Sequence, residues 1–224
     1  MASVVEAKRD ATRRGLEKAE LDHLVYATPD LEATIESLER LMGVRASPGG
    51  RHPNEGTRNA LIALGPARYL EIVGPDPAQP DPGRPRWFGI DALRAPRLAG
   101  WAARAADLEG IRVEAGRAGV TLGPVMSGSR QRSDGTLLSW RFTDPHTLAA
   151  DGVIPFFIDW GESPHPARAA AGGVALLGLR AEHPDPEGVR KALAALGLEL
   201  PVSPEPGAAL AATLLTPRGR IELR

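Results

Sequence analysis

His23 and Glu71 are polar residues inside two short apolar runs, and their side chains suit either acid–base chemistry or metal ligation. His23 lies in the run 21–27, and Glu71 lies in the run 69–73. A carboxylate in a central strand is costly unless it is paired, coordinated or facing a cavity. We therefore expect Glu71 to face a cavity, with a salt bridge to Arg58 as the alternative. For His23 the alternative is a half-buried histidine bonded to a neighbouring strand.

Several other polar and aromatic residues are candidates for lining such a cavity. His52 and Asn59 bracket a polar, glycine-rich segment that could close over a ligand. Arg130 suits a carboxylate or phosphate, although arginines on hairpins are more often solvated. Trp140 and Trp160 are candidates for the apolar wall. The remaining histidines stand beside proline or aspartate in turns and are expected at the surface: His146, His165 and His183.

The composition excludes several classes of site. The 224 residues include no cysteine, so disulfides, thiolate nucleophiles, iron–sulfur clusters and cysteine-based zinc sites are excluded. A formal net charge of −1 gives no overall field that would attract nucleic acid or an anionic membrane. The glycine-rich segment 48–56 lacks the lysine of a nucleotide-binding loop. We expect a small-molecule ligand and no nucleotide cofactor. Because the sequence has no apolar run long enough for a signal peptide or membrane span, we expect a cytoplasmic protein.

The elements that must position these residues recur along the chain. Asp-Leu-Glu or Asp-Pro-Glu stands at 30–32, 107–109 and 185–187, with successive copies 77 and 78 residues apart (107 − 30 and 185 − 107). Gly43, Gly119 and Gly197 stand where the helix that follows each of these starts would end. Each copy predicts a strand, a helix and three strands. The predicted modules span 21–86, 97–162 and, for a shorter third one, 172–224. Residues 1–20 are expected to form a solvated helical extension.

These modules, together with five short segments, resemble the vicinal oxygen chelate superfamily, which includes glyoxalase I, extradiol dioxygenases and fosfomycin-resistance enzymes. The segments span 21–31, 49–53, 56–61, 69–72 and 157–161, and they make the chain look like a glyoxalase-like member. The resemblance implies an α+β fold of repeated βαβββ modules that form a curled, open mixed sheet around a cavity, with two main modules and a shorter third. It also implies one divalent metal ion, bound by a residue from the first strand and one from the last strand of each paired module.

Counting from the helix starts finds the residues at these ligand positions, and only some of them can bind a metal. In the first module they fall on His23 and Glu71. In the second they fall on Gly100 and Ile158, whose side chains cannot ligate a metal. Asp159 is one residue away and would point to the other face of a regular strand. We keep Asp159 as a candidate pocket residue that a bulge could bring inward.

The third module leaves two metal sets open. Its positions fall on Gly178 and Glu222. If the first module pairs with the third, the ligands are His23, Glu71 and Glu222. If it pairs with the second, His52 in its flexible segment is the expected third ligand.

The resemblance implies a glyoxalase-like protein in which His23 and Glu71 are metal ligands or the catalytic acid–base pair. The expected activity is that of a metal-dependent lyase, isomerase or dioxygenase-like enzyme acting on a small oxygenated substrate. The alternative is a binding protein that sequesters a small molecule, because the second module lacks its ligand positions. An odd number of modules leaves one pairing face unused, so a homodimer is also expected.

Overall fold

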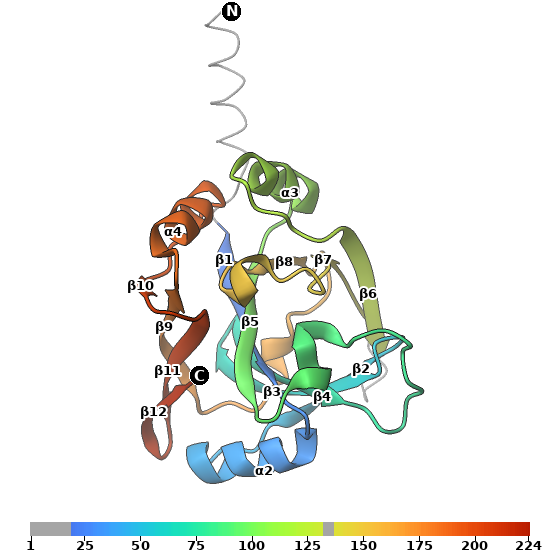
Figure 1. Ribbon diagram of the computed structural model, residues 1–224. Helices are drawn as coiled ribbons and strands as arrows, with labels where there is room; N and C mark the ends of the chain where they lie inside the picture. The colour runs from blue at the N-terminus through green and yellow to red at the C-terminus, as the bar shows by residue number, and fades with distance from the viewer. Residues whose placement is uncertain (1–18, 132–136) are drawn as a thin grey trace, which may run out of the picture.

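The computed structural model describes residues 19–131 and 137–224 of the 224-residue chain, so the expected extension at 1–20 lies outside it except for Ala19 and Glu20. Strand, helix and three strands follow one another three times (Figure 1). The first unit consists of β1 (Glu20–Ala27), α2 (Leu31–Met42), β2 (Ser47–His52), β3 (Thr57–Gly65) and β4 (Arg68–Pro75). The second consists of β5 (Arg97–Arg104), α3 (Leu108–Arg117), β6 (Val125–Gln131), β7 (Leu137–Thr143) and β8 (Phe156–Asp159). The third consists of β9 (Ala175–His183), α4 (Pro186–Ala195), β10 (Val202–Pro204), β11 (Ala209–Thr216) and β12 (Gly219–Leu223).

Short 3-10 helices lie in the connections: η1 (Trp87–Ala92), η2 (Ala149–Gly152) and η3 (Pro166–Arg168). No helix among the described residues is long and apolar enough to span a membrane.

The repeated signals at the helix ends are confirmed. The side chains of Asp30, Asp107 and Asp185 each accept a hydrogen bond from the backbone N–H three residues later. This satisfies one of the N–H groups that the first turn leaves without a helical partner. A glycine with a left-handed backbone follows each helix within two residues, at Gly43 (φ 76°), Gly119 (φ 79°) and Gly197 (φ 72°). Aspartate and glycine therefore fix the same start and stop in all three units.

The strands of the described residues form two sheets, and their order decides which modules pair. One sheet has eight strands in the order β2-β3-β4-β1-β5-β8-β7-β6, and the other has four in the order β10-β9-β11-β12. β1 runs parallel to β4 and antiparallel to β5, so the first and second units meet at the β1–β5 pair. The third unit builds the second sheet (Figure 1). The fold is α+β with a curled mixed sheet, as expected, and the pairing of the first module with the third is wrong.

The eight-stranded sheet curls until its two edge strands approach each other. A Cβ atom added at Gly49 or Gly50 of β2 would lie 3.0 Å from Nη1 of Arg130 on β6. Arg130 therefore lies across these two glycines and bridges the edges. The inner face of the curl encloses the space between the edges and the central strands.

Alternation along β1 and β4 sends successive side chains to opposite faces of this sheet. Leu24, Leu70 and Ile72 join the main hydrophobic core on the outer face, together with the buried stripe of α2. The same core includes Leu214 of β11, so the second sheet packs against the outside of the first. His23 and Glu71 alternate with these core residues and point into the curl.

Two adjacent leucines of β11 test whether the third unit is part of one cooperative fold. Leu214 is 0% exposed within the main core, whereas Leu215 is 49% exposed. Leu214→Ala should lower the free energy of unfolding by about 2–5 kcal/mol, because it removes buried methyl groups and leaves a cavity. Leu215→Ala is the control and should change it by less than about 0.5 kcal/mol. Chemical denaturation should show a single transition in both variants. A separate early transition in Leu214→Ala would contradict the shared core.

Candidate functional site

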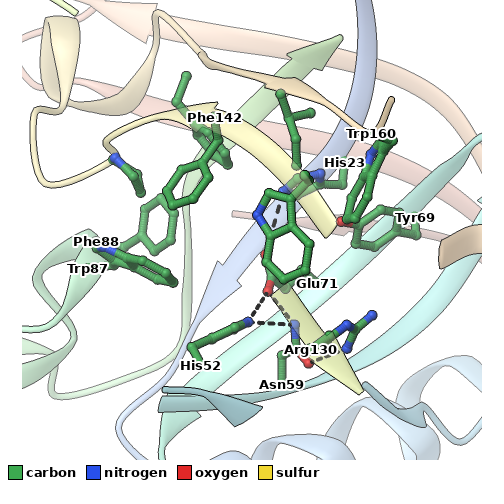
Figure 2. A pocket seen from close by; sticks show the side chains of 14 residues that line it. His23, His52, Asn59, Tyr69, Glu71, Trp87, Phe88, Arg130, Phe142 and Trp160 are labelled. Carbon is green, nitrogen blue, oxygen red and sulfur yellow. Dashed lines mark hydrogen bonds and ion pairs between the residues drawn. The ribbon is translucent and has the colours of Figure 1, made fainter. Parts of the chain in front are cut away.

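A cavity lies on the inner face of the curled sheet, with polar groups at one end and aromatic rings around them (Figure 2). Its polar residues are His23, His52, Asn59, Glu71 and Arg130. Its wall is formed by Tyr69, Trp87, Phe88, Trp140, Phe142, Pro145, Phe156, Ile158 and Trp160. The cavity volume is about 50 Å³. A single water needs roughly 10–15 Å³, so the space between the side chains as they stand is small.

Glu71 is the centre of the polar end. It is only 8% exposed, and Asn59 Nδ2 donates a hydrogen bond of 2.5 Å to its Oε1. Nε2 of His52 lies 3.7 Å from Oε1, and Nε2 of His23 lies 3.5 Å from Oε2. The alternative partner Arg58 pairs with Glu32 at 3.0 Å instead, because it neighbours Asn59 on β3 and points to the opposite face. The cavity environment expected for Glu71 is therefore observed.

His52 and Asn59 come from the antiparallel β2–β3 pair and continue this hydrogen-bond chain. Nδ1 of His52 lies 2.9 Å from Oγ1 of Thr57, and its Nε2 lies 3.2 Å from Nδ2 of Asn59. Since the Asn59 amide donates toward Nε2, the proton of His52 is assigned to Nδ1, which donates to Thr57. Arg130 Nη1 is 3.4 Å from Oδ1 of Asn59. Burial, opposed by Glu71 and reinforced by Arg130 and His23, lowers the pKa of His52.

Asp22, which sequence reasoning did not select, lies directly behind His23. It is 0% exposed, and its Oδ1 is 2.8 Å from Nδ1 of His23. Nε2 of His165 lies 3.1 Å from Oδ2 of Asp22, and Nε1 of Trp160 donates a hydrogen bond to the same oxygen at 3.2 Å. Burial by itself would raise the pKa of Asp22, but the hydrogen bonds and charges of His165 and His23 hold it well below its usual range.

The expected surface position of His165 is therefore wrong, because its ring is largely buried against Asp22. One sequence signal pointed to this pair: Asp22 and His23 are adjacent polar residues in an apolar strand. No such local signal exists for His165, whose bond to Asp22 spans 143 residues.

Two of the predicted residues lie away from the cavity. Glu222 is on β12 of the second sheet, where its side chain is 40% exposed and pairs with Arg180 at 3.1 Å. Asp159 accepts a hydrogen bond from the backbone N–H of Gly161 at 2.9 Å and is not among the lining residues. β8 carries Ile158 inward, so alternation turns Asp159 outward. Arg130, Trp140 and Trp160 do line the cavity.

Apart from Arg130 on β6, the second unit contributes an apolar wall where the first contributes polar groups. Ile158 lines the cavity at the position that counting sets against Glu71. At Gly100, the position set against His23, an added Cβ atom would lie 3.6 Å from the ring of Phe88. Phe88 and Trp87 come from η1, in the connection between the units, and sequence reasoning did not select either as a wall residue. The site is thus chemically one-sided.

The donor set does not fit a metal centre. Among residues 19–131 and 137–224, no group of three or more histidine, aspartate or glutamate side chains could hold a metal ion. His23, His52 and Glu71 do lie together, but Asn59 occupies Oε1 of Glu71 and faces Nε2 of His52. A closed metal site needs three or four donors converging on one point, and here the Asn59 amide takes that place.

Comparisons with known proteins found one family model and several solved structures that are similar to this chain. A family model described as "Glyoxalase-like domain" matches residues 21–197. A hypothetical protein from Staphylococcus aureus superimposes with a TM-score of 0.62 at 11% identity, over 92% of this chain and 99% of that one. Methylmalonyl-CoA epimerase from Mycobacterium tuberculosis gives a TM-score of 0.42 at 23% identity, over 66% and 91% of the two chains. A Streptomyces coelicolor epimerase solved with 2-nitronate-propionyl-CoA gives 0.43 at 20%, over 67% and 100%. No curated protein sequence matches the chain significantly.

The lowered pKa of His52 predicts a specific loss of stability in mild acid. As the pH falls through about 6.5, the unfolded chain takes up a proton at this histidine, whereas the folded protein keeps the ring neutral to lower pH. The free energy of unfolding should therefore fall on acidification, with a contribution from His52 of up to about 1.4 kcal/mol per pH unit. The free energy of unfolding, measured with urea at several pH values between 7.5 and 5.5, should depend less steeply on pH in His52→Gln than in the wild type. His183→Gln, which lies outside the cavity, should keep the pH dependence of the wild type. The same pH dependence in all three proteins would contradict the lowered pKa of His52.

Proposed function

The chain belongs to the glyoxalase-like domain family, and we propose that it is an isomerase or lyase that moves a proton on carbon in a small oxygenated substrate, with Glu71 as the base. The observation that carries this proposal is the buried Glu71 carboxylate at the polar end of an aromatic cavity. The Asn59 hydrogen bond orients this carboxylate, and a positioned carboxylate can act as a general base.

The proposed first step is removal of a proton from a carbon next to a substrate carbonyl. Glu71 takes the proton, and the electron pair of the C–H bond moves to the carbonyl oxygen to give an enolate. With Nδ1 and Nε2 both protonated, His23 would keep its bond to Asp22 and donate a second hydrogen bond from Nε2 to that oxygen. When that carbon also carries a hydroxyl group, the hydroxyl proton moves to the enolate oxygen, and return of the first proton to the former carbonyl carbon completes an isomerisation. Loss of a group from the adjacent carbon completes an elimination, with the proton transferred to the leaving group.

The cavity dimensions and walls support a small substrate. A volume of about 50 Å³ admits a molecule of a few heavy atoms unless the aromatic side chains move. The rings of Trp87, Phe142 and Trp160 line the cavity, and such apolar walls strengthen the hydrogen bonds and charge interactions beside them. The substrate class that fits is a small carbonyl compound with an acidic C–H bond.

A non-catalytic binding protein is the second candidate, and the one-sided cavity favours it. Ile158 and the ring of Phe88 occupy the side on which the second module would supply ionisable groups. Such a wall would hold an apolar molecule without reacting with it. In that case Glu71 and its partners would serve only to bind a polar end of the ligand.

Hydrogen exchange separates the two candidates. The probes are pyruvate, hydroxyacetone and acetoacetate in D₂O, and NMR follows their C–H signals. At least one of them should lose its C–H signal faster with the protein than without it. Glu71→Gln should lower the enzyme-dependent rate by on the order of 10²–10⁴-fold, the range for a general base. Glu222→Gln is a matched control and should retain the wild-type rate. Ligand-induced line broadening without exchange would favour the binding protein, and neither exchange nor broadening for any compound would contradict the proposed substrate class.

Metal content gives a second test of the same site. Because Asn59 takes the place where donors would converge, protein purified without added metal should contain far less than one transition-metal ion per chain. A chelator should leave both its melting temperature and its exchange activity unchanged. One metal ion per wild-type chain, lost in Glu71→Gln, would contradict this and favour metal-dependent chemistry.

A further inference from the structure

We propose that Asp22 is a positioning residue: it holds the ring of His23 with a proton on Nδ1, so that Nε2 faces Glu71 and the cavity. The catalytic meaning of this arrangement rests on the proposed function, but the arrangement itself can be measured without any substrate. Four observations support it: a bulge in β1, the donors around Asp22, the buried position of the carboxylate and the packing of the His23 ring.

The bulge explains how two adjacent residues of one strand can bond to each other. In the pairing of β1 with β5, Leu21 lies opposite Ala103 and His23 lies opposite Ala102, so Asp22 is the extra residue. In a regular strand Asp22 and His23 would point to opposite faces. A bulge re-aims the side chains around it, and here Oδ1 of Asp22 comes to 2.8 Å from Nδ1 of His23.

The donors around Asp22 show that its carboxylate acts as an acceptor on every side. Ala167 donates its backbone N–H to Nδ1 of His165, so the proton of a neutral His165 is on Nε2, which donates to Oδ2. Trp160 donates its indole N–H to the same carboxylate, and Nε of Arg104 lies 3.3 Å from Oδ2. An ionised carboxylate has only acceptors, so the group that faces it from His23 must be an N–H.

The ring of His23 is also held in one orientation. It stacks on Tyr69, with centroids 4.6 Å apart and planes inclined by 17°, and Phe156 meets it edge-on at 5.4 Å. A ring flip would place a carbon atom against Asp22 and lose a charge-assisted hydrogen bond in a buried site. The stack and the Asp22 bond together point Nε2 toward Oε2 of Glu71, 3.5 Å away.

A structural role for Asp22 is the competing explanation. Its bonds to Trp160 and His165 tie the segment after β8 to β1, and that tie would matter for stability in a protein with no activity at all. The two roles differ in what they require of His23. The bond to His165 uses Oδ2 and the Trp160 indole reaches both oxygens, whereas positioning His23 needs Oδ1 and the proton on Nδ1.

The test is the protonation state of the His23 ring in the full chain with ¹⁵N-labelled histidine. At pH 7.5 the wild-type spectrum should show Nδ1 of His23 carrying a proton, with the signal assigned by its absence in His23→Gln. A ring protonated only on Nε2 would overturn the proposal, and this measurement needs no folded Asp22 variant. In Asp22→Asn, Nδ1 should shift toward the unprotonated range. His165→Gln, which leaves the Oδ1 contact in place, should lose stability and keep the wild-type His23 signals.

Exchange kinetics then connect the ring to the reaction. With the compound that exchanges in the wild type, Asp22→Asn should lower kcat by about 10- to 100-fold, the usual effect of losing an orienting partner, at a nearly constant KM. An unchanged kcat would overturn the positioning role. If the expected Nδ1 proton is observed but the wild type exchanges none of the three compounds, the proposed function fails and the assignment of Asp22 to the His23 ring stands.

Discussion

β1 is hydrogen-bonded to β4 on one side and to β5 on the other, and these two pairings place His23 and Glu71 side by side in the cavity. The parallel pairing with β4 brings Glu71 beside the first strand, and the antiparallel pairing with β5 joins the two units. The bulge at Asp22 sits in the β5 pairing. The contact that unites the curled sheet therefore also turns a carboxylate toward the back of His23. The pairing of β1 with β5 is therefore needed both for the fold and for the site.

The cavity is one-sided because the two units that build it contribute different side chains at related positions. The first unit supplies His23, His52, Asn59 and Glu71, whereas the second supplies an aliphatic and aromatic surface that includes Ile158, with Arg130 as its polar lining residue among those described. This division favours proton transfer over a symmetric metal centre, since a base and an acid need only one polar cluster. The third unit takes no part in lining the cavity and packs on the outer face of the large sheet.

Most of the fold could be predicted from local sequence signals. The features that could not be predicted depend on contacts between residues far apart in the sequence. Aspartate caps and glycine stops act within one helical turn, so the order of strands and helices was predictable from them. His23 and Glu71 were recognisable because each is a polar residue in an apolar strand. Asp22 was missed because its orientation depends on a bulge against a strand about 80 residues away. Glu222 was misplaced because counting cannot decide which module pairs with which.

The most direct test of the central claim, that Glu71 is the base, is chemical rescue of hydrogen exchange in Glu71→Ala. Removing the side chain leaves space beside Asn59 and His23 that a small carboxylate can enter. Formate should restore the lost exchange in a saturable manner by at least about 10-fold, within the range attributed to a general base, whereas chloride at equal ionic strength should not. Exchange in Glu71→Ala that equals the wild-type rate, or lost exchange that formate fails to restore in a folded variant, would contradict the account.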